Sequence, residues 1–194
     1  MARYTGPKWK ISRRENADVF GDEKWRRRPT LPGEHPVSRS RPSEYAQQFR
    51  EKQKVKRTYG LMEKQFRNLY KKASKATGNT GTRLLQLLEM RLDNVAFRLG
   101  LAKTRNQARQ FVNHGHITVN GEKVDIPSYS VSVGDEVEFG PKFGKSDIAK
   151  TVKAETKQEA RPGWLSAGKV KSVPTRDMLD QSIREQLIIE LYSR

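Results

Sequence analysis

Positive charge is the feature that most constrains how this chain can fold. Its 194 residues include 39 Lys and Arg against 22 Asp and Glu, which leaves a formal net charge of +17. Self-repulsion on that scale destabilises a compact chain unless an anionic partner neutralises it. Only 34% of the residues are hydrophobic, so we expect a polyanion to help organise the fold.

A membrane, an acidic protein or a nucleic acid could be that polyanion, and the sequence favours nucleic acid. No run approaches the roughly 18 apolar residues that a membrane-spanning helix needs, and charged residues stand where a signal peptide would be apolar. The chain contains no Cys, so it has neither a disulfide nor a thiolate metal site. His35, His114 and His116 are too few and too scattered to replace one. We therefore expect no metal, no cofactor, no membrane contact and a cytoplasmic location.

The chain divides into an arm, a helical part and an inserted module, which makes the expected fold class α+β. Residues 1–43 are interrupted by Pro and Gly and predict an extended basic arm with one short helix. Residues 44–90 predict a basic helical domain, and residues 155–194 complete it if a terminal helix at 180–193 docks back. Residues 91–154 then form an inserted α/β module of two helices on a small antiparallel sheet.

Local signals place most of the helices. Ser43 is the expected N-cap of a helix that runs to about Arg57. Apolar residues at helical spacing predict a second helix over 62–76 and a third over 82–99. Thr104 is the expected N-cap of the next helix, which Gly115 should end.

The sheet and the C-terminal part follow from other signals. Asn120-Gly121 between short β-branched runs predicts a hairpin with a type I′ turn. Alternation over 136–139 predicts a further strand. A short helix is expected at 147–157, and Trp164-Leu165 is the expected buried anchor of the loop-rich segment that follows.

Bases cluster on the first two long helices. Ten Lys or Arg and only two acids lie between Arg50 and Lys75. A solvated face usually mixes both signs of charge, whereas clustered bases are typical of nucleic-acid binding. Contact with phosphates therefore explains this region better than solvation alone.

Charge is segregated within the module. Residues 91–109 hold five bases and one acid, and residues 110–139 hold one base and five acids. Arg105 and Arg109 are four residues apart and share a helix face. Arg105 also lies in a first helical turn, where the helix dipole favours an anion over a cation. A bound phosphate would offset that cost, so the helices of the module are expected to face the polyanion.

Several segments resemble the bacterial-type small-subunit ribosomal protein S-four family. Those in the module are Arg91-Leu-Asp-Asn-Val-Ala-Phe-Arg-Leu-Gly100, Thr104-Arg105 with Ala108-Arg109, and His116-Ile-Thr-Val-Asn-Gly121. Those elsewhere are residues 1–15, Arg50-Glu-Lys-Gln-Lys-Val-Lys-Arg57, Gln65-Phe-Arg-Asn68, Gly78-Asn-Thr-Gly81 and Glu190-Leu-Tyr-Ser193. Pseudouridine synthases, some tyrosyl-tRNA synthetases and small heat-shock RNA binders carry the module too. The spread of matches over nearly the whole chain makes the resemblance specific to the ribosomal family.

The resemblance implies a structural constituent of the small ribosomal subunit that binds small-subunit rRNA directly, at a multi-helix junction of the 5′ domain, and nucleates assembly. It also implies contact with neighbouring ribosomal proteins, notably S-five, a place near the channel through which mRNA enters, and a role in translational accuracy. Many relatives hold zinc through four Cys in the N-terminal arm, and that site is absent here. The candidate RNA-binding residues are Arg3, Lys8, Arg13, Arg14, Arg50, Lys54, Arg57, Arg67, Lys71, Arg91, Arg98, Lys103, Thr104, Arg105, Arg109, Asn113, His114 and Asn120. The candidates for the mRNA path are Arg39 and Arg41.

Two alternatives remain open at this point. An RNA-modifying enzyme would need a catalytic domain with a placed nucleophile or base, and the chain offers no room for one. Asp93, the acid within the helical half of the module, is better explained by a cap or by an ion pair with a nearby Arg. A free regulatory RNA or DNA binder is harder to exclude, because phosphate contacts carry no sequence information.

Overall fold

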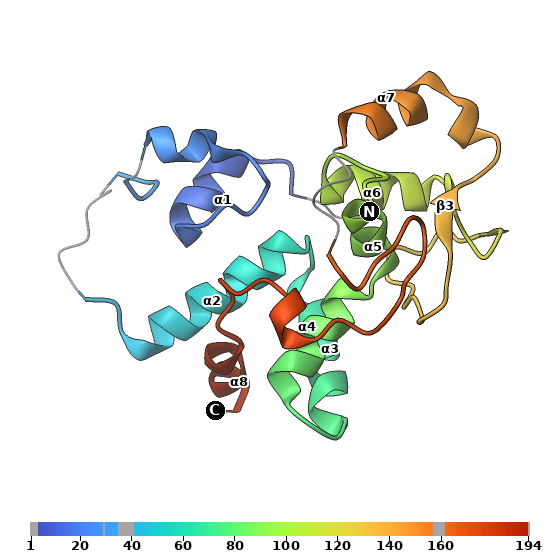
Figure 1. Cartoon of the computed structure of the whole chain (residues 1–194). Helices are drawn as coiled ribbons and strands as arrows, with labels where there is room; N and C mark the ends of the chain where they lie inside the picture. Colours follow the sequence, from blue (N-terminus) through green and yellow to red (C-terminus); the bar gives the residue numbers. More distant parts are fainter. Residues whose placement is uncertain (1–3, 29, 35–40, 157–161, 194) are drawn as a thin grey trace. The chain divides into compact units, whose positions relative to one another are not determined.

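The computed structural model describes residues 4–28, 30–34, 41–156 and 162–193. Two compact units make up the chain, one from residues 1–75 with 182–194 and one from residues 76–181. Figure 1 shows the chain coloured along its sequence. Each unit is described by itself.

Unit 1 is helical. Its elements are α1 (Lys8–Glu15), the 3₁₀ helix η1 (Glu23–Arg27), α2 (Glu44–Thr58), α3 (Glu63–Lys75) and α8 (Glu185–Ser193). As predicted, Ser43 caps α2 by accepting a hydrogen bond from the Ala46 amide at 3.2 Å. The terminal helix α8 packs against α2 (Figure 1). It starts at Glu185 and not at residue 180, because residues 179–182 are extended or in turns.

Buried side chains on each helix hold unit 1 together. Val55, Phe66 and Ile188 are fully buried on α2, α3 and α8. The Tyr192 ring of α8 stacks on the Tyr70 ring of α3 with centroids 4.6 Å apart. The arm has its own small core, in which Trp25 is buried at 8% exposure. The described part of the arm is therefore folded to a greater degree than the single short helix that the sequence predicts.

Unit 2 contains helices on a three-stranded sheet. Its helices are α4 (Thr80–Glu89), α5 (Leu92–Arg98), α6 (Arg105–Asn113), α7 (Asp147–Glu155) and the 3₁₀ helices η2 (Phe143–Lys145) and η4 (Arg176–Met178). The strands β1 (Ile117–Val119), β2 (Glu122–Lys123) and β3 (Val137–Phe139) form an antiparallel sheet in the order β2-β1-β3. The α+β fold class is confirmed.

The sheet has one buried face, as its alternating sequence predicts. Ile117 pairs with Phe139 and Val119 pairs with Val137, and all four side chains are buried. They pack against apolar side chains of α5 and α6 in one hydrophobic cluster. Trp164 and Leu165 join the same cluster at 0% and 5% exposure, so their predicted role as an anchor is confirmed.

One helix prediction is wrong. The stretch expected to form a single helix over 82–99 forms α4 and α5, which are separated at Met90 and Arg91. Arg91 is extended and makes an antiparallel bridge with Ser130, a partner far along the chain. The amides of Leu92 and Asp93 donate to the carbonyls of Tyr129 and Pro127 and not to a preceding helical turn. A long-range contact has overridden local helical periodicity here.

The compact units also end elsewhere than at the expected domain boundaries of 90/91 and 154/155. They divide at 75/76 and 181/182. Helix α4 belongs with unit 2, since Gln86 donates to the Pro174 carbonyl at 2.9 Å and Glu89 binds side chains of α5. The segment after 161 belongs there too, because Trp164 lies in the core of unit 2.

Candidate nucleic-acid interface

Helix α3 presents a row of exposed cations. Residues three or four apart share a helix face, and this spacing aligns four exposed bases opposite the buried Phe66 and Ala73. We call these four residues the α3 stripe. Its members are Lys64, Arg67, Lys71 and Lys75. Within the described part of the chain none of them forms an ion pair, so the stripe is a surface of uncompensated positive charge. The sequence predicts Arg67 and Lys71 as contacts, and the same spacing could have added Lys64 and Lys75.

The bases of α2 have partners inside the protein. Arg50 and Arg57 both pair with Glu15 of α1, whose side chain is fully buried, and the Arg50–Glu15 distance is 3.3 Å. The two guanidinium side chains are still 38% and 29% exposed. Lys54 pairs with Glu51 at 2.7 Å and donates to the Ser182 carbonyl at 2.8 Å. These bases therefore tie α2 to α1 and to the segment that precedes α8, as well as adding positive charge to the surface.

The hydrogen-bonding capacity of the Glu15 carboxylate is only partly satisfied. One of its two carboxylate oxygens, Oε2, is buried without a hydrogen-bond partner in the described structure. Burial raises the pKa of Glu15 above its ordinary value although Arg50 and Arg57 oppose the rise. The sequence contains no signal for this contact, since the two arginines lie on a helix far along the chain.

Bases of the arm are placed differently from one another. Lys8 is exposed and lies over the Phe20 ring at 5.8 Å. Arg13 donates to the carbonyls of Thr30 and Leu31 at 2.8 and 3.2 Å, so it stabilises the arm. Arg14 is exposed and donates to the Pro32 carbonyl at 3.5 Å. Arg3 lies outside the described residues.

In unit 2 the buried Glu89 organises several predicted contact residues. Its carboxylate, 1% exposed, accepts two hydrogen bonds from Arg98, at 3.1 and 2.9 Å. It also accepts one from Asn94 at 2.7 Å. The side-chain oxygen of Asn94, Oδ1, accepts in turn a hydrogen bond from Arg105 Nε at 2.9 Å. The Arg105 guanidinium lies 4.6 Å from the Phe97 ring centroid, so it is held by a hydrogen bond and a cation–π contact.

Asp93 is the second buried carboxylate of this region. It accepts two hydrogen bonds from Arg91, at 3.1 and 2.9 Å, and both side chains are less than 10% exposed. Arg109 Nη1 lies 4.0 Å from the same carboxylate. Burial lowers the pKa of Arg109, while Asp93 acts in the opposite direction. The expected ion pair between Asp93 and a nearby Arg is confirmed.

The two carboxylates explain how four arginines can lie close together around α5 and α6. Arg91, Arg98 and Arg105 are hydrogen-bonded to a carboxylate or an amide, and Arg109 lies 4.0 Å from Asp93. These partners reduce the repulsion between neighbouring guanidinium groups. A guanidinium group carries five N–H donors in a planar fork whose geometry matches a phosphate as well as a carboxylate. Arg98 and Arg105 are half-buried, whereas Arg91 is 5% exposed and lies largely in the interior.

The remaining predicted residues of the module are structural at least in part. Thr104 caps α6 by accepting from the Gln107 amide at 3.2 Å, and Lys103 is exposed and pairs with Glu155. Asn113 is the last residue of α6, and His114 is exposed beside it.

Asn120 fixes the hairpin. Its side chain donates to Asp135 and accepts from the Glu136 amide, each at 2.9 Å, and its positive φ of 52° fits the type I′ turn that the sequence predicts.

Of the two candidates for the mRNA path, one lies among the residues that the structure describes. Arg41 is exposed just before α2, and Arg39 lies outside the described residues.

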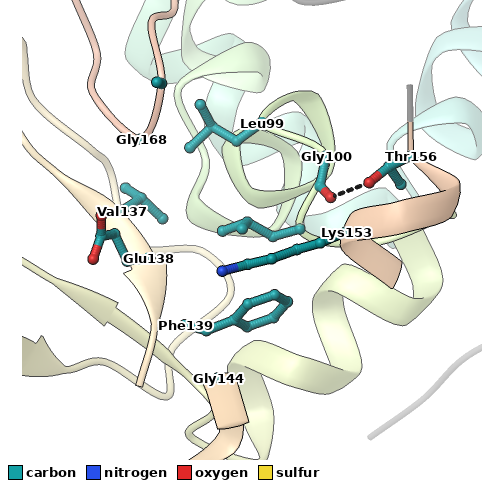
Figure 2. Close-up of a pocket in the computed structure, with 11 residues that line it drawn as sticks. Leu99, Gly100, Val137, Glu138, Phe139, Gly144, Lys153, Thr156 and Gly168 are labelled. Carbon is teal, nitrogen blue, oxygen red and sulfur yellow. Dashed lines mark hydrogen bonds between the residues drawn. The ribbon is translucent and has the colours of Figure 1, made fainter. Parts of the chain in front are cut away.

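A cavity of about 320 Å³ opens in unit 2 beside β3 (Figure 2). Leu99, Val137 and Phe139 line it, and Thr156 closes one side by donating to the Gly100 carbonyl at 2.7 Å. Its ionisable lining groups are Glu138 and Lys153, and the Lys153 ammonium lies 5.5 Å from the Phe139 ring centroid.

Over the described ranges, no helix is both long and apolar enough to cross a membrane. Nor do the described His, Asp and Glu residues gather in groups of three or more that could hold a metal ion.

Comparisons with known proteins agree on one family. The family model described as "Ribosomal protein S4/S9 N-terminal domain" matches residues 3–89, and the model described as "S4 domain" matches residues 90–137. Among similar curated proteins, the small ribosomal subunit protein uS4 of Herpetosiphon aurantiacus is 53% identical, and those of Opitutus terrae and Cutibacterium acnes are 50% identical. Each alignment covers 100% of both chains.

Proposed function

We propose, because this chain belongs to the family of the small ribosomal subunit protein uS4, that it binds small-subunit ribosomal RNA directly and early in subunit assembly. Its relatives are structural ribosomal proteins, so the chain is not an enzyme. The observation that carries the proposal is the α3 stripe, a row of exposed cations that no carboxylate of the described structure compensates. Phosphate groups of folded RNA are the anions that best match such a row.

A second contact surface is proposed on α5 and α6. Glu89 holds the Arg98 guanidinium with two hydrogen bonds and Asn94 holds that of Arg105 with one, while Arg109 lies 4.0 Å from Asp93. Side chains restrained in this way lose less entropy on binding. Such a face suits the backbone and shape of duplex RNA, where readout depends on phosphates and 2′-hydroxyl groups. Arg105→Ala should weaken RNA binding and reduce the slope of log affinity against log salt by about one.

The finer details of the role rest on the family resemblance. We propose that the RNA target is a multi-helix junction in the 5′ domain and that binding nucleates assembly. The exposed Arg41 is proposed to lie near the channel through which mRNA enters, and a neighbouring protein, S-five, is the proposed protein partner. Reconstitution of small subunits without this protein should then stall before the later 5′-domain proteins join.

The rival function is a free regulator that binds RNA or DNA generally. Equilibrium binding of the purified protein to the 5′-domain transcript, across salt concentrations and with excess transfer RNA, separates the two. Tight binding that survives the competitor supports the proposal. Binding that the competitor abolishes, or that duplex DNA equals, supports the general regulator.

A further inference from the structure

Aromatic rings of unit 2 form a connected series from the core to the surface. Phe139 is 8% exposed, Phe143 and His116 are half-buried, and His114 is exposed. Successive ring centroids lie 5.4, 4.0 and 5.7 Å apart in that order. We call these four residues the ring ladder. Phe111 of α6 supports it from the core, with its ring centroid 5.0 Å from that of Phe143.

The central pair of the ladder has the geometry of stacked bases. The planes of His116 and Phe143 are 9° from parallel, which is a stacked arrangement. The backbone holds His116 firmly, because its amide donates to the Phe111 carbonyl and its carbonyl accepts from the Gly140 amide, at 2.9 and 2.8 Å. The His116 ring is therefore a preformed platform on a rigid part of the module.

The charge state of His116 suits stacking with a neutral base. Burial lowers its pKa, and the neighbouring His114 and Lys123 lower it further. The lowered pKa favours the neutral form of the ring near pH 7. A neutral imidazole offers a π face together with one hydrogen-bond donor and one acceptor.

Cations lie close to the ladder in the structure or in the sequence. The Lys123 stem packs closely on Gly115, next to His116 in sequence. Lys142 and Lys145, on either side of Phe143 in sequence, are both exposed. The acidic Asp135 lies near the Asn120 turn, at the opposite end of β1 from the Ile117–Phe139 pair. Rings interleaved with cations are the usual composition of surfaces that stack single-stranded bases.

We propose that His116 and His114 at the outer end of the ring ladder form a subsite for one unpaired nucleobase of the bound RNA. This inference rests on the proposed RNA-binding function and adds a contact to the base itself. A duplex has no free base face to offer, so this subsite would take an unpaired nucleotide beside the duplex that the face of α5 and α6 contacts. Phosphates on either side of the base would lie among Lys123, Lys142 and Lys145.

The first test uses the full-length protein and two short RNA probes. One probe is a single-stranded adenosine tetramer, and the other is the same ribose-phosphate chain without bases. Nuclear magnetic resonance of the His and Phe rings should show upfield shifts at His114, His116 and Phe143 with the adenosine probe alone. Equal shifts with both probes, or no shift in the ladder, would overturn the proposal.

The second test compares two substitutions of His116 in binding to the 5′-domain transcript. His116→Phe keeps a ring that can stack, whereas His116→Leu keeps apolar bulk without a π face. The Leu variant should bind at least about fivefold more weakly than the Phe variant. Thermal unfolding of both variants shows whether either is misfolded, and in that case the probe experiment on the parent protein decides.

The outcomes separate the two proposals. If the parent protein binds the transcript tightly and both variants bind equally well, the base subsite is wrong and the RNA-binding function stands. If the parent protein does not bind the transcript in preference to transfer RNA, the ribosomal function itself is wrong.

Discussion

Glu89 shows how much of the module depends on one buried carboxylate. It joins α4 to α5 through Asn94 and Arg98 at the point where the chain is not helical. Both of its oxygens accept a hydrogen bond from the charged Arg98, and hydrogen bonds with an ionised partner are among the stronger ones in proteins. Loss of its charge would leave Arg98 with a weaker partner in a half-buried position.

Glu89→Gln should lower the free energy of unfolding by about 1–3 kcal/mol, because hydrogen bonds to charged groups contribute on that scale. Urea unfolding measures the change. The matched control is Glu122→Gln, an exposed position on β2, which should change stability by less than about 0.5 kcal/mol. Equal effects at the two positions would show that the buried network does not stabilise the unit.

Glu63 should make the stability of unit 1 depend on acid pH. Burial alone would raise its pKa, but hydrogen bonds from Lys52, Lys56 and Tyr192 outweigh burial and hold the pKa at about 2, below the ordinary 4.5. The stabilising contribution is therefore complete above about pH 4.5 and is lost as the pH falls toward 2. The difference in unfolding free energy between the parent and Glu63→Gln should shrink over that window. A difference that stays constant would contradict the assignment.

At the residue scale, local chemistry could be predicted and long-range partners could not. The caps at Ser43 and Thr104 and the Asn120 turn are confirmed because each depends on neighbours in sequence. The partners of Glu15 and Glu89 could not be predicted, because only the folded chain brings those carboxylates to their arginines.

At the scale of elements, helix α3 has two clearly separate faces, one that packs in the core and one that carries the proposed RNA contacts. Arg67→Ala combined with Lys71→Ala should weaken binding to the 5′-domain transcript and reduce the salt slope by about two, one for each lost phosphate contact. The matched control is Lys150→Ala with Lys169→Ala, which removes the same charge from cations that pair with Asp147 and Glu136. Equal losses in the two double variants would mean that net charge, and not the stripe, drives binding.

The hairpin of β1 and β2 depends on backbone conformation at its turn. Gly121 has a φ of +83° and open space around an added Cβ. Gly121→Ala should therefore destabilise unit 2 by about 1–2 kcal/mol through backbone strain alone. Gly163→Ala is the control, since an added Cβ there also meets nothing and φ is not in the left-handed range. Thermal unfolding of both variants distinguishes strain from a general effect of added side chains.

The division between α4 and α5 marks the limit of prediction from periodicity. Leu84, Leu88, Leu92 and Val95 follow a helical spacing across the break and are all buried, so the pattern fits one helix. The extended Arg91 and its bridge to Ser130 decide otherwise. The spacing of apolar residues along the chain cannot reveal a bridge to a segment that is distant in the sequence.

At the scale of the whole molecule, the excess of positive charge is distributed over two compact units that are organised in the same way. Each unit has its own hydrophobic core and its own basic surface, and buried carboxylates hold selected arginines in both. The two cores thus fix the positions of the basic side chains on the surface. The exposed cations of the α3 stripe still need an external anion to neutralise them. Folded RNA is the polyanion that this account assigns to that role.

The most direct test is a hydroxyl-radical footprint of the purified protein on naked 5′-domain ribosomal RNA at physiological salt. The account predicts strong protection confined to one multi-helix junction, with no other ribosomal protein present. Protection that is weak and spread evenly over the RNA would contradict a primary, specific binder and would leave a basic protein with general affinity for RNA.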